Sequence, residues 1–174
     1  MYVVGAFTKY GLDVSPGIVR LNSNLTFDNT FNVGAGFTNW VNTSGHTGVR
    51  TVAEAIDGTC DVYVGGTFSQ YQGGTRNRID RLDDNGNYDA GFNVGTGFDD
   101  NVMKIKTIND GSGDIYVSGK FTEINGIVIA SNKIIRLNSN GTIDASFDAA
   151  NLFGASVANQ VFDFSIVDDV YGTI

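Results

Sequence analysis

The sequence has few of the residues from which reactive sites are built. Its 174 residues include one histidine and one cysteine. A catalytic arrangement of the Ser-His-Asp or Cys-His type therefore has only one possible base, His46, and a zinc site has only two ligands of these types. Cys60 has no second cysteine for an internal disulfide, and we predict that its side chain is small, apolar and partly buried. We predict no catalytic residue, no cofactor and no zinc site.

Positive charge and long apolar runs are also scarce. Lysine and arginine total 11 against 19 aspartates and glutamates, so the formal net charge is −8. Nucleic-acid binding needs a basic surface, and no stretch approaches the roughly 18 apolar residues of a membrane-spanning helix. We therefore predict no nucleic-acid partner and no membrane insertion. Met1 leads into an apolar segment without the basic region that opens a signal peptide, so targeting lies elsewhere or the chain is part of a longer one.

Proline is nearly absent, with 1 residue, whereas glycine occurs 23 times. This balance favours short strands joined by tight turns over a bundle of helices. One glycine recurs in a fixed context, in "YVVGAF" at 2–7, "YVGGTF" at 63–68 and "YVSGKF" at 116–121. Glycine weakens the interior of a strand, so the recurrence of Gly5, Gly66 and Gly119 needs a structural reason.

This glycine belongs to a sequence repeat with constant internal spacings. The motif Ile-x-Arg-Leu occurs three times, and a phenylalanine follows its arginine by eleven residues in each copy. A valine-led segment precedes a tyrosine by fourteen residues in each copy. The landmarks are Ile18, Ile79 and Ile134; Phe31, Phe92 and Phe147; and Val49, Val102 and Val157. The period is 61 residues and then 53, because eight residues are inserted between Phe37 and Val49.

Each period holds about four short strands, such as "VMKIKTI", "DIYVSGKF", "NKIIRLN" and one around "TIDASF". Four antiparallel strands in a period of this length describe the blade of a β-propeller. We therefore predict an all-β fold of three four-stranded antiparallel blades, an incomplete ring, formed by one repeat array over residues 1–174. The recurrent glycine then allows neighbouring backbones to approach closely, and the phenylalanine that follows fills the space between blades.

Hairpin turns are marked by Asn85-Gly86 and Asn140-Gly141, since both central residues of a type I′ turn need positive φ. Asn24-Leu25 stands at the equivalent place in the first copy. Leucine is strained at positive φ, so we predict that this turn has another shape.

The repeat resembles a known family. Its elements "YVGGTF", "RIDRLDDNG", "YDAGF" and "VGTGF" are similar to the delta-60 β-propeller repeat of secreted bacterial proteins and some phage proteins. More distantly it is similar to kelch blades, which also carry Gly-Gly in an inner strand. The resemblance covers nearly the whole chain. It implies a propeller fold and an extracellular, cell-surface or virion location, and it implies no catalytic residues.

An aspartate follows each Ile-x-Arg-Leu arginine by eight residues. The pairs are Arg20 and Asp28, Arg81 and Asp89, and Arg136 and Asp144. The intervening turn brings the two sides together, and a pair repeated in every blade is more typical of a structural clamp than of an acid–base pair. A partly buried guanidinium can bind a carboxylate through two parallel hydrogen bonds.

A second group of oxygens lies in "LDDNGNYD" at 82–89. Asp83, Asn85, Asn87 and Asp89 alternate along this segment, as calcium ligands do. The equivalent segments "LNSNLTFD" and "LNSNGTID" have far fewer carboxylates, and Asx residues favour turns in their own right. We interpret the segment as a hairpin turn and keep the metal site as a weaker alternative.

The inserted segment "TNWVNTSGHTG" at 38–48 contains the only tryptophan and the only histidine. Long loops on a rigid scaffold often carry binding sites, and an aromatic face beside amides and hydroxyls suits a sugar or a protein. The candidate binding residues are Asn39, Trp40, Asn42, Thr43 and His46. The alternative is that Trp40 only covers the edge of a blade.

These features predict a non-enzymatic binding or scaffold module of a phage virion protein, of tail or fibre type, or of a secreted bacterial surface protein. The partner would be a glycan or a protein receptor. The alternative is a glycan-processing enzyme, which needs two carboxylates across a sugar; Asp99, Asp100 and Glu123 are available, but their spacing does not single them out. Propellers have about four to eight blades, so we also expect further blades of a longer chain, or a homo-oligomer.

Overall fold

The computed structural model describes residues 1–40, 47–129, 133–147 and 161–166. All regular structure in these ranges is β, so the predicted all-β class is confirmed. The described ranges contain no helix long and apolar enough to cross a membrane.

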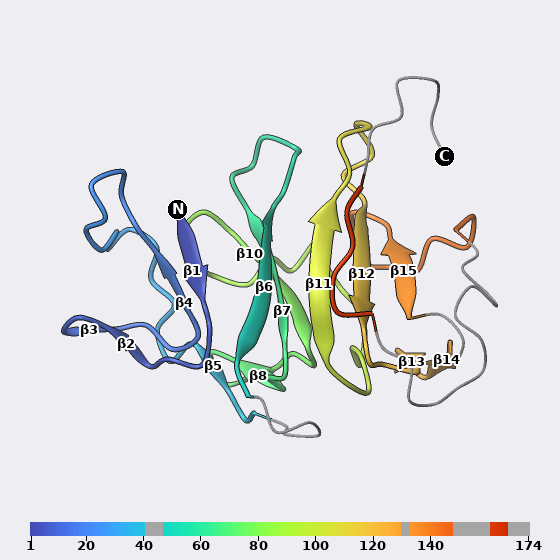
Figure 1. The fold of residues 1–174 in the computed structure, drawn as a ribbon, viewed down its shortest axis with the longest axis horizontal. Helices are drawn as coiled ribbons and strands as arrows, with labels where there is room; N and C mark the ends of the chain where they lie inside the picture. Colours follow the sequence, from blue (N-terminus) through green and yellow to red (C-terminus); the bar gives the residue numbers. More distant parts are fainter. Residues whose placement is uncertain (41–46, 130–132, 148–160, 167–174) are drawn as a thin grey trace.

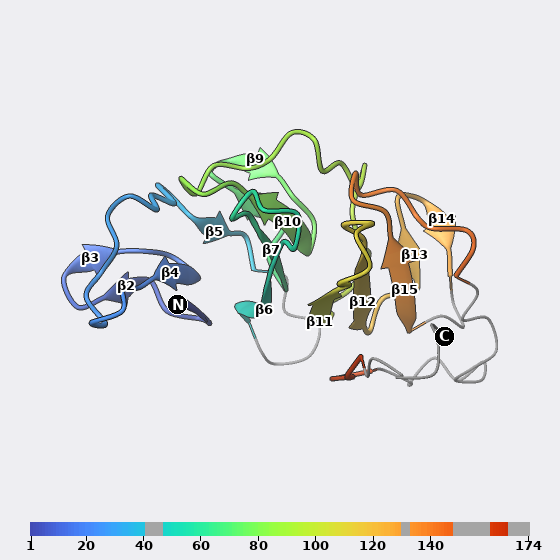
Figure 2. The same ribbon diagram turned by 90° about the horizontal axis from the view of Figure 1, so that it is seen from above.

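Three antiparallel sheets form the blades, and they follow one another along the chain (Figure 1). The first pairs β1 (Tyr2–Val4) with β4 (Ile18–Arg20). The second has the order β10 (Ile79–Leu82), β7 (Val62–Gly66), β6 (Val49–Glu54). The third has the order β11 (Val102–Thr107), β12 (Ile115–Gly119), β15 (Ile134–Leu137). Seen from above, β6 and β11 lie close together at the centre of a fan, while β4, β10 and β15 point outwards (Figure 2). The arrangement is that of consecutive propeller blades.

The predicted fourth strand is reduced to one isolated bridge per blade. The bridges are Leu21 with Phe27, Leu82 with Tyr88, and Leu137 with Ile143. One residue further on, the aspartate carboxylate turns back and accepts a hydrogen bond from the backbone N–H two residues ahead, as Asp89 does from Gly91 at 2.7 Å. This turn takes the chain out of the sheet, so the described sheets of the three blades have two or three strands instead of the predicted four.

Each blade carries instead a small hairpin that the sequence analysis did not predict. These hairpins are β2 (Lys9–Tyr10) with β3 (Asp13–Val14), β8 (Gln70–Tyr71) with β9 (Gly74–Thr75), and β13 (Glu123–Ile124) with β14 (Ile127–Val128). The second hairpin also pairs with β5 (Phe37–Thr38) from the preceding blade, and Phe98 bridges Ile124 in the same way. The hairpins therefore tie one blade to the next.

The core lies between the blades. Phe68 and Phe121 are fully buried, and each packs on a phenylalanine from the preceding blade, Phe37 and Phe98, at ring-centroid distances of 4.3 and 4.4 Å. The predicted role of these phenylalanines is therefore correct for the second and third blades. The two glycines before Phe68, Gly65 and Gly66, face different neighbours, and each is packed too closely to carry a side chain.

A side chain at either glycine would meet an immediate neighbour. A Cβ on Gly66 would lie 2.5 Å from the carbonyl oxygen of Gly48, the residue just before β6 in the same blade. A Cβ on Gly65 would lie 2.5 Å from the Val102 side chain of the next blade. The predicted close backbone approach is present, but within the blade, at a bulge in β6 where the register shifts between Val49 and Thr51.

Two local predictions were wrong. Leu25 has φ 65° and the same turn hydrogen bond as Gly86, with its N–H donating to Asn22 over 3.0 Å. A Cβ on Gly86 would lie 3.0 Å from the Asn32 backbone of the preceding blade, whereas Leu25 is exposed because no described blade precedes it. Cys60 is exposed and has φ 65°, since it occupies the turn position that Gly113 fills in the next blade.

Candidate functional site

The three predicted Arg–Asp pairs are present in the structure. The nitrogen–oxygen distances are 2.7 Å for Arg20 with Asp28, 3.3 Å for Arg81 with Asp89, and 3.2 Å for Arg136 with Asp144. Each arginine lies on the outer strand of a blade, and the aspartate follows the turn after that strand.

Two of these arginines have closer partners that were not predicted from the sequence. Arg81 lies 2.6 Å from Asp57 and 2.9 Å from Asp61, and it donates to the Tyr63 hydroxyl over 3.1 Å. Arg136 lies 2.9 Å from Asp114, which with Asp110 repeats the same arrangement. The signal was available, because "DGTCD" at 57–61 and "DGSGD" at 110–114 precede their tyrosines by the same spacing.

We define the Arg81 cluster as Arg81 with Asp57, Asp61, Asp89 and Tyr63. Burial raises the pKa of Asp61 in spite of the hydrogen bond from Arg81, whereas Asp57 and Arg81 are held in their charged forms. Burial opposes ionisation of Asp57, but hydrogen bonds from Thr59 and Arg81 outweigh it and lower the pKa to about 2. Burial also disfavours the guanidinium, but its hydrogen bonds to the carboxylates hold the pKa of Arg81 well above its usual range. Since these groups satisfy one another, the cluster is a structural clamp that joins three segments of a blade.

The oxygens of the weaker candidate metal site at 83–89 accept hydrogen bonds from the turn itself. Asp83 Oδ1 accepts hydrogen bonds from the backbone N–H groups of Asn85 and Asn87, at 2.9 and 2.8 Å. Asp89 is engaged by Arg81 and Gly91. Within the described part of the chain, no group of three or more His, Cys, Asp or Glu side chains is placed to hold a metal ion. The oxygens of this segment stabilise its turn.

Two of the three carboxylates considered for glycan hydrolysis, Asp99 and Asp100, are also engaged in local structure. Asp99 accepts hydrogen bonds from the backbone N–H groups of Thr122 and Glu123, both at 2.9 Å, and fixes the start of the β13–β14 hairpin. Burial raises the pKa of Asp99, but these bonds and the Thr122 hydroxyl outweigh it and lower the pKa. The Asp100 carboxylate lies 3.7 Å from the Lys120 ammonium group.

The predicted binding loop is seen only at its start. Asn39 is exposed, and its carbonyl accepts hydrogen bonds from the Ser69 N–H and hydroxyl. Trp40 is half-buried and packs against the core between the first two blades. Asn42, Thr43 and His46 lie outside the described residues. The position of Trp40 fits the alternative that it covers a blade edge.

One buried carboxylate breaks the repeat. Asp80 in β10 is 2% exposed, and the equivalent residues are Val19, 0% exposed, and Ile135, 4% exposed. Asp80 Oδ1 accepts a hydrogen bond from the N–H of Arg81 at 3.1 Å. Asp80 Oδ2 accepts none, and it lies 3.3 Å from Arg76 Nε. Burial, opposed by Arg76, raises the pKa of Asp80 to about 7.

Asp80 lines a small cavity of about 240 Å³, which we call the blade-two pocket. Apolar residues that line it include Ile79 and Phe92. Polar residues from two segments also line it: Thr75, Arg76, Asn77, Asp89 and Asn93. Tyr88 also lines it and is 47% exposed. The Arg76 guanidinium lies 4.2 Å from the centre of the Tyr88 ring, so one cation contacts both the buried acid and the exposed aromatic ring.

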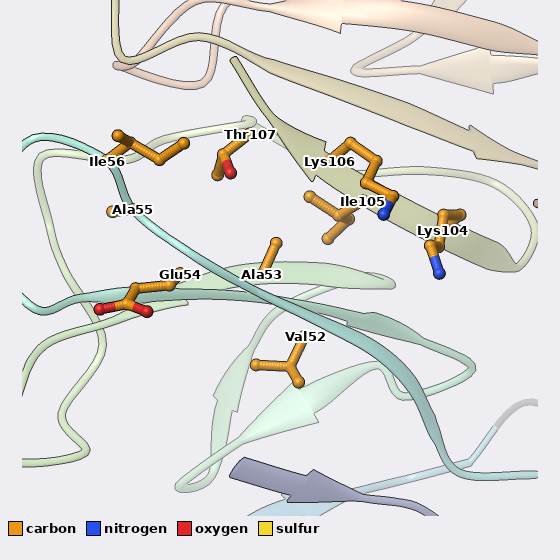
Figure 3. Close-up of a pocket in the computed structure, with 9 residues that line it drawn as sticks. All are labelled: Val52, Ala53, Glu54, Ala55, Ile56, Lys104, Ile105, Lys106 and Thr107. Atoms are coloured by element: carbon orange, nitrogen blue, oxygen red, sulfur yellow. The ribbon is translucent and has the colours of Figure 1, made fainter. Parts of the chain in front are cut away.

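A larger and more open groove, of about 500 Å³, runs between the inner strands β6 and β11. Figure 3 shows Lys104 and Lys106 on the β11 side and Glu54 on the β6 side, directed away from the lysines. Lys104 forms an ion pair of 3.1 Å with Asp163 in the segment 161–166. Apart from these charged groups, the groove is lined mainly by aliphatic side chains of the two strands.

Fold and repeated clamp together define the class of protein, an array of β-propeller blades. The chain belongs to the family described as a domain of unknown function (DUF5122) beta-propeller, whose model matches residues 1–31, 61–92 and 111–147, more than half of the chain. Each matched range contains one clamp arginine, its aspartate and the phenylalanine eleven residues after the arginine. No curated protein matches the chain.

Proposed function

We propose that this chain is a non-enzymatic binding module on a propeller scaffold, in a phage virion protein or a secreted bacterial surface protein. The observation that carries the proposal is the contrast between the repeated charges and the blade-two pocket. The repeated arginines and aspartates bind one another in every blade, whereas Arg76, Asp80 and Tyr88, which line the pocket, have no counterpart of the same kind in the other two blades. A repeat that departs from its own pattern at a solvent-accessible cavity is typical of a binding site on a rigid scaffold.

The resemblance to the delta-60 repeat supports an extracellular, cell-surface or virion location, and a glycan or protein receptor as partner. The engagement of Asp99 in the β13–β14 hairpin argues against its use as a hydrolytic acid or nucleophile. Further blades, from a longer chain or from a second copy, would complete the scaffold.

The proposal is tested by incubating the chain with purified bacterial surface polysaccharides and measuring two quantities on the same samples. We expect binding by isothermal titration calorimetry without any release of reducing ends. A release of reducing ends that Asp99→Asn abolishes would establish the glycan-processing alternative. Binding that Trp40→Ala removes, in a variant with unchanged thermal unfolding, would place the contact at the inserted loop.

A further inference from the structure

Asp80 is not required by the packing of the blade. The first and third blades place Val19 and Ile135 at this position, both buried, and build the same strand pairing with them. A buried carboxylate is costly unless it is well paired, and an aliphatic side chain of similar size is often at least as stabilising. The aspartate of the second blade therefore serves something other than the stability of the sheet.

The pairing of Asp80 is incomplete. Asp61, which is 8% exposed, accepts a hydrogen bond of 2.9 Å from Arg81 in the clamp. Asp80 is more deeply buried, yet its Oδ2 accepts no hydrogen bond. Its ion-pair partner Arg76 has a side chain that is 31% exposed, so this guanidinium can adjust to a ligand. The Oδ2 atom is itself covered and lies against Arg76, so a donor from outside the protein reaches this unsatisfied acceptor when the Arg76 guanidinium moves aside.

Tyr88 also departs from the repeat. Phe27 and Ile143 stand at the equivalent positions and are half-buried, whereas Tyr88 is exposed. The pocket therefore combines a carboxylate acceptor, a guanidinium donor and an aromatic ring, with the side chains of Asn77 and Asn93 at its border. Its volume of about 240 Å³ lies below the range of roughly 300 to 1,000 Å³ that is typical of sites for drug-sized ligands.

We propose that the blade-two pocket binds a single pyranose unit of a glycan. A sugar hydroxyl donates to Asp80, neighbouring hydroxyls accept from Arg76, and the apolar C–H groups of the sugar ring pack on Tyr88. A polyhydroxylated ring meets this donor and acceptor set better than a simple ion, because it supplies donors, acceptors and an apolar face together. This inference rests on the proposed function and assigns its glycan contact to one site.

The test uses the 174-residue chain and four methyl glycosides, the α-glucoside, β-galactoside, α-rhamnoside and β-N-acetylglucosaminide. Binding is followed by saturation-transfer and ¹⁵N-correlation NMR. We expect at least one glycoside to bind and to shift the amide signals of Asp80, Arg81 and Tyr88. At pH 8, where the Asp80 carboxyl is mostly ionised, Asp80→Val, which copies the first blade, is expected to lower the affinity by about tenfold or more, because a hydrogen bond to a charged group is lost.

Matched variants separate binding from folding. Tyr88→Ile copies the third blade and is expected to weaken binding at least about fivefold, from the loss of the ring contact. Ile135→Val alters the same strand position in the third blade and leaves binding unchanged. Each variant must show a cooperative thermal transition.

The proposal is overturned if no glycoside binds, or if Asp80→Val and Tyr88→Ile bind as the unaltered chain does. If polysaccharide binding persists in Asp80→Val but is lost in Trp40→Ala, the pocket assignment fails and the proposed function stands. If Asp80→Val abolishes binding of a lysine-rich peptide while no glycoside binds, the pocket recognises protein and the pyranose proposal fails. If neither polysaccharides nor glycosides bind the unaltered chain, both proposals fail.

Discussion

At the scale of single residues, a repeat protein provides its own controls. Positions that are equivalent in the blades differ only where local surroundings or function differ. Asp80 stands where Val19 and Ile135 stand, and Leu25 stands where Gly86 and Gly141 stand. Both differences are visible in the sequence, but their meaning depends on burial and φ, which the sequence does not contain.

Replacing Asp80 with valine is expected to stabilise the chain in a pH-dependent way. The pKa of Asp80 is about 7 in the folded chain and about 4 in an unfolded one. Between these values the folded chain holds a proton that the unfolded chain has lost, so the free energy of unfolding decreases as pH rises through this window. Arg76, Asp89 and Tyr71 are the ionisable groups that act on Asp80 or respond to it.

Valine has no proton to lose. Asp80→Val should therefore raise the free energy of unfolding by about 1 to 4 kcal/mol at pH 8, and by much less at pH 4. Urea unfolding at both pH values measures the two differences. An equal gain at both, or a loss at pH 8, would contradict a buried carboxylate with a raised pKa.

Leu25 and Gly86 form a matched pair for turn geometry. Leu25 is 58% exposed and has positive φ, so Leu25→Gly should relieve strain and stabilise the chain by about 0.5 to 1 kcal/mol. Gly86→Leu should destabilise it by about 2 kcal/mol or more, because a Cβ there meets the Asn32 backbone of the preceding blade. Thermal unfolding of both variants checks the opposite signs; a destabilised Leu25→Gly would show that the leucine side chain makes a contact worth more than the strain.

At the scale of the elements, the clamp arginine holds a blade together. Arg81 is 6% exposed and binds three carboxylates and a tyrosine hydroxyl. Arg81→Leu should cost about 3 kcal/mol, since it leaves the buried Asp61 carboxylate without its partner. Arg136 binds a similar set but its side chain is 22% exposed, so Arg136→Leu should cost clearly less. The difference in urea midpoint between the two variants measures the effect of burial, and equal midpoints would contradict it.

The elements also show where sequence reasoning succeeded. The three main strands of a blade follow from apolar runs and constant spacings, and the Arg–Asp pairs follow from an eight-residue separation. The hairpins β2–β3, β8–β9 and β13–β14 could not be found in this way. They have strands of two residues each, with no periodicity to detect, and β8 pairs with β5 of another blade. Long-range pairing decides their structure, not local propensity.

A binding role on a propeller scaffold could be predicted from the sequence, but the position of the candidate site could not. Trp40 drew attention because it is the only tryptophan, yet it packs against the core. Asp80 occupies the variable position of the Ile-x-Arg-Leu motif. The motif and its spacing are the same in all three copies, so the change of residue at this position did not stand out. Its burial and its incomplete hydrogen bonding become visible only when β10 is placed against Arg76.

At the scale of the whole molecule, the fan of blades has an uncovered side. Among the described residues, β1 pairs only with β4, whereas the equivalent β7 lies between β6 and β10. The inner edge of β1 therefore presents backbone donors and acceptors without a strand partner. Internal blade junctions place Gly86 and Gly141 against the preceding backbone, and Leu25 occupies this place in the first blade. A blade that docks on the first one must therefore adjust around the leucine side chain.

An open strand edge of this kind favours association with another strand. We expect the isolated chain to self-associate with increasing concentration in sedimentation-velocity experiments. Val3 lies in β1 and is 36% exposed, and a lysine on an edge strand opposes pairing by its charge and hydration. Val3→Lys should therefore reduce the associated fraction, while Leu12→Lys, at a position that is 96% exposed and outside β1, should leave it unchanged. A chain that stays monomeric at all concentrations and unfolds cooperatively would show that three blades are stable without a partner at this edge, and the expectation of further blades or a second copy would then be wrong.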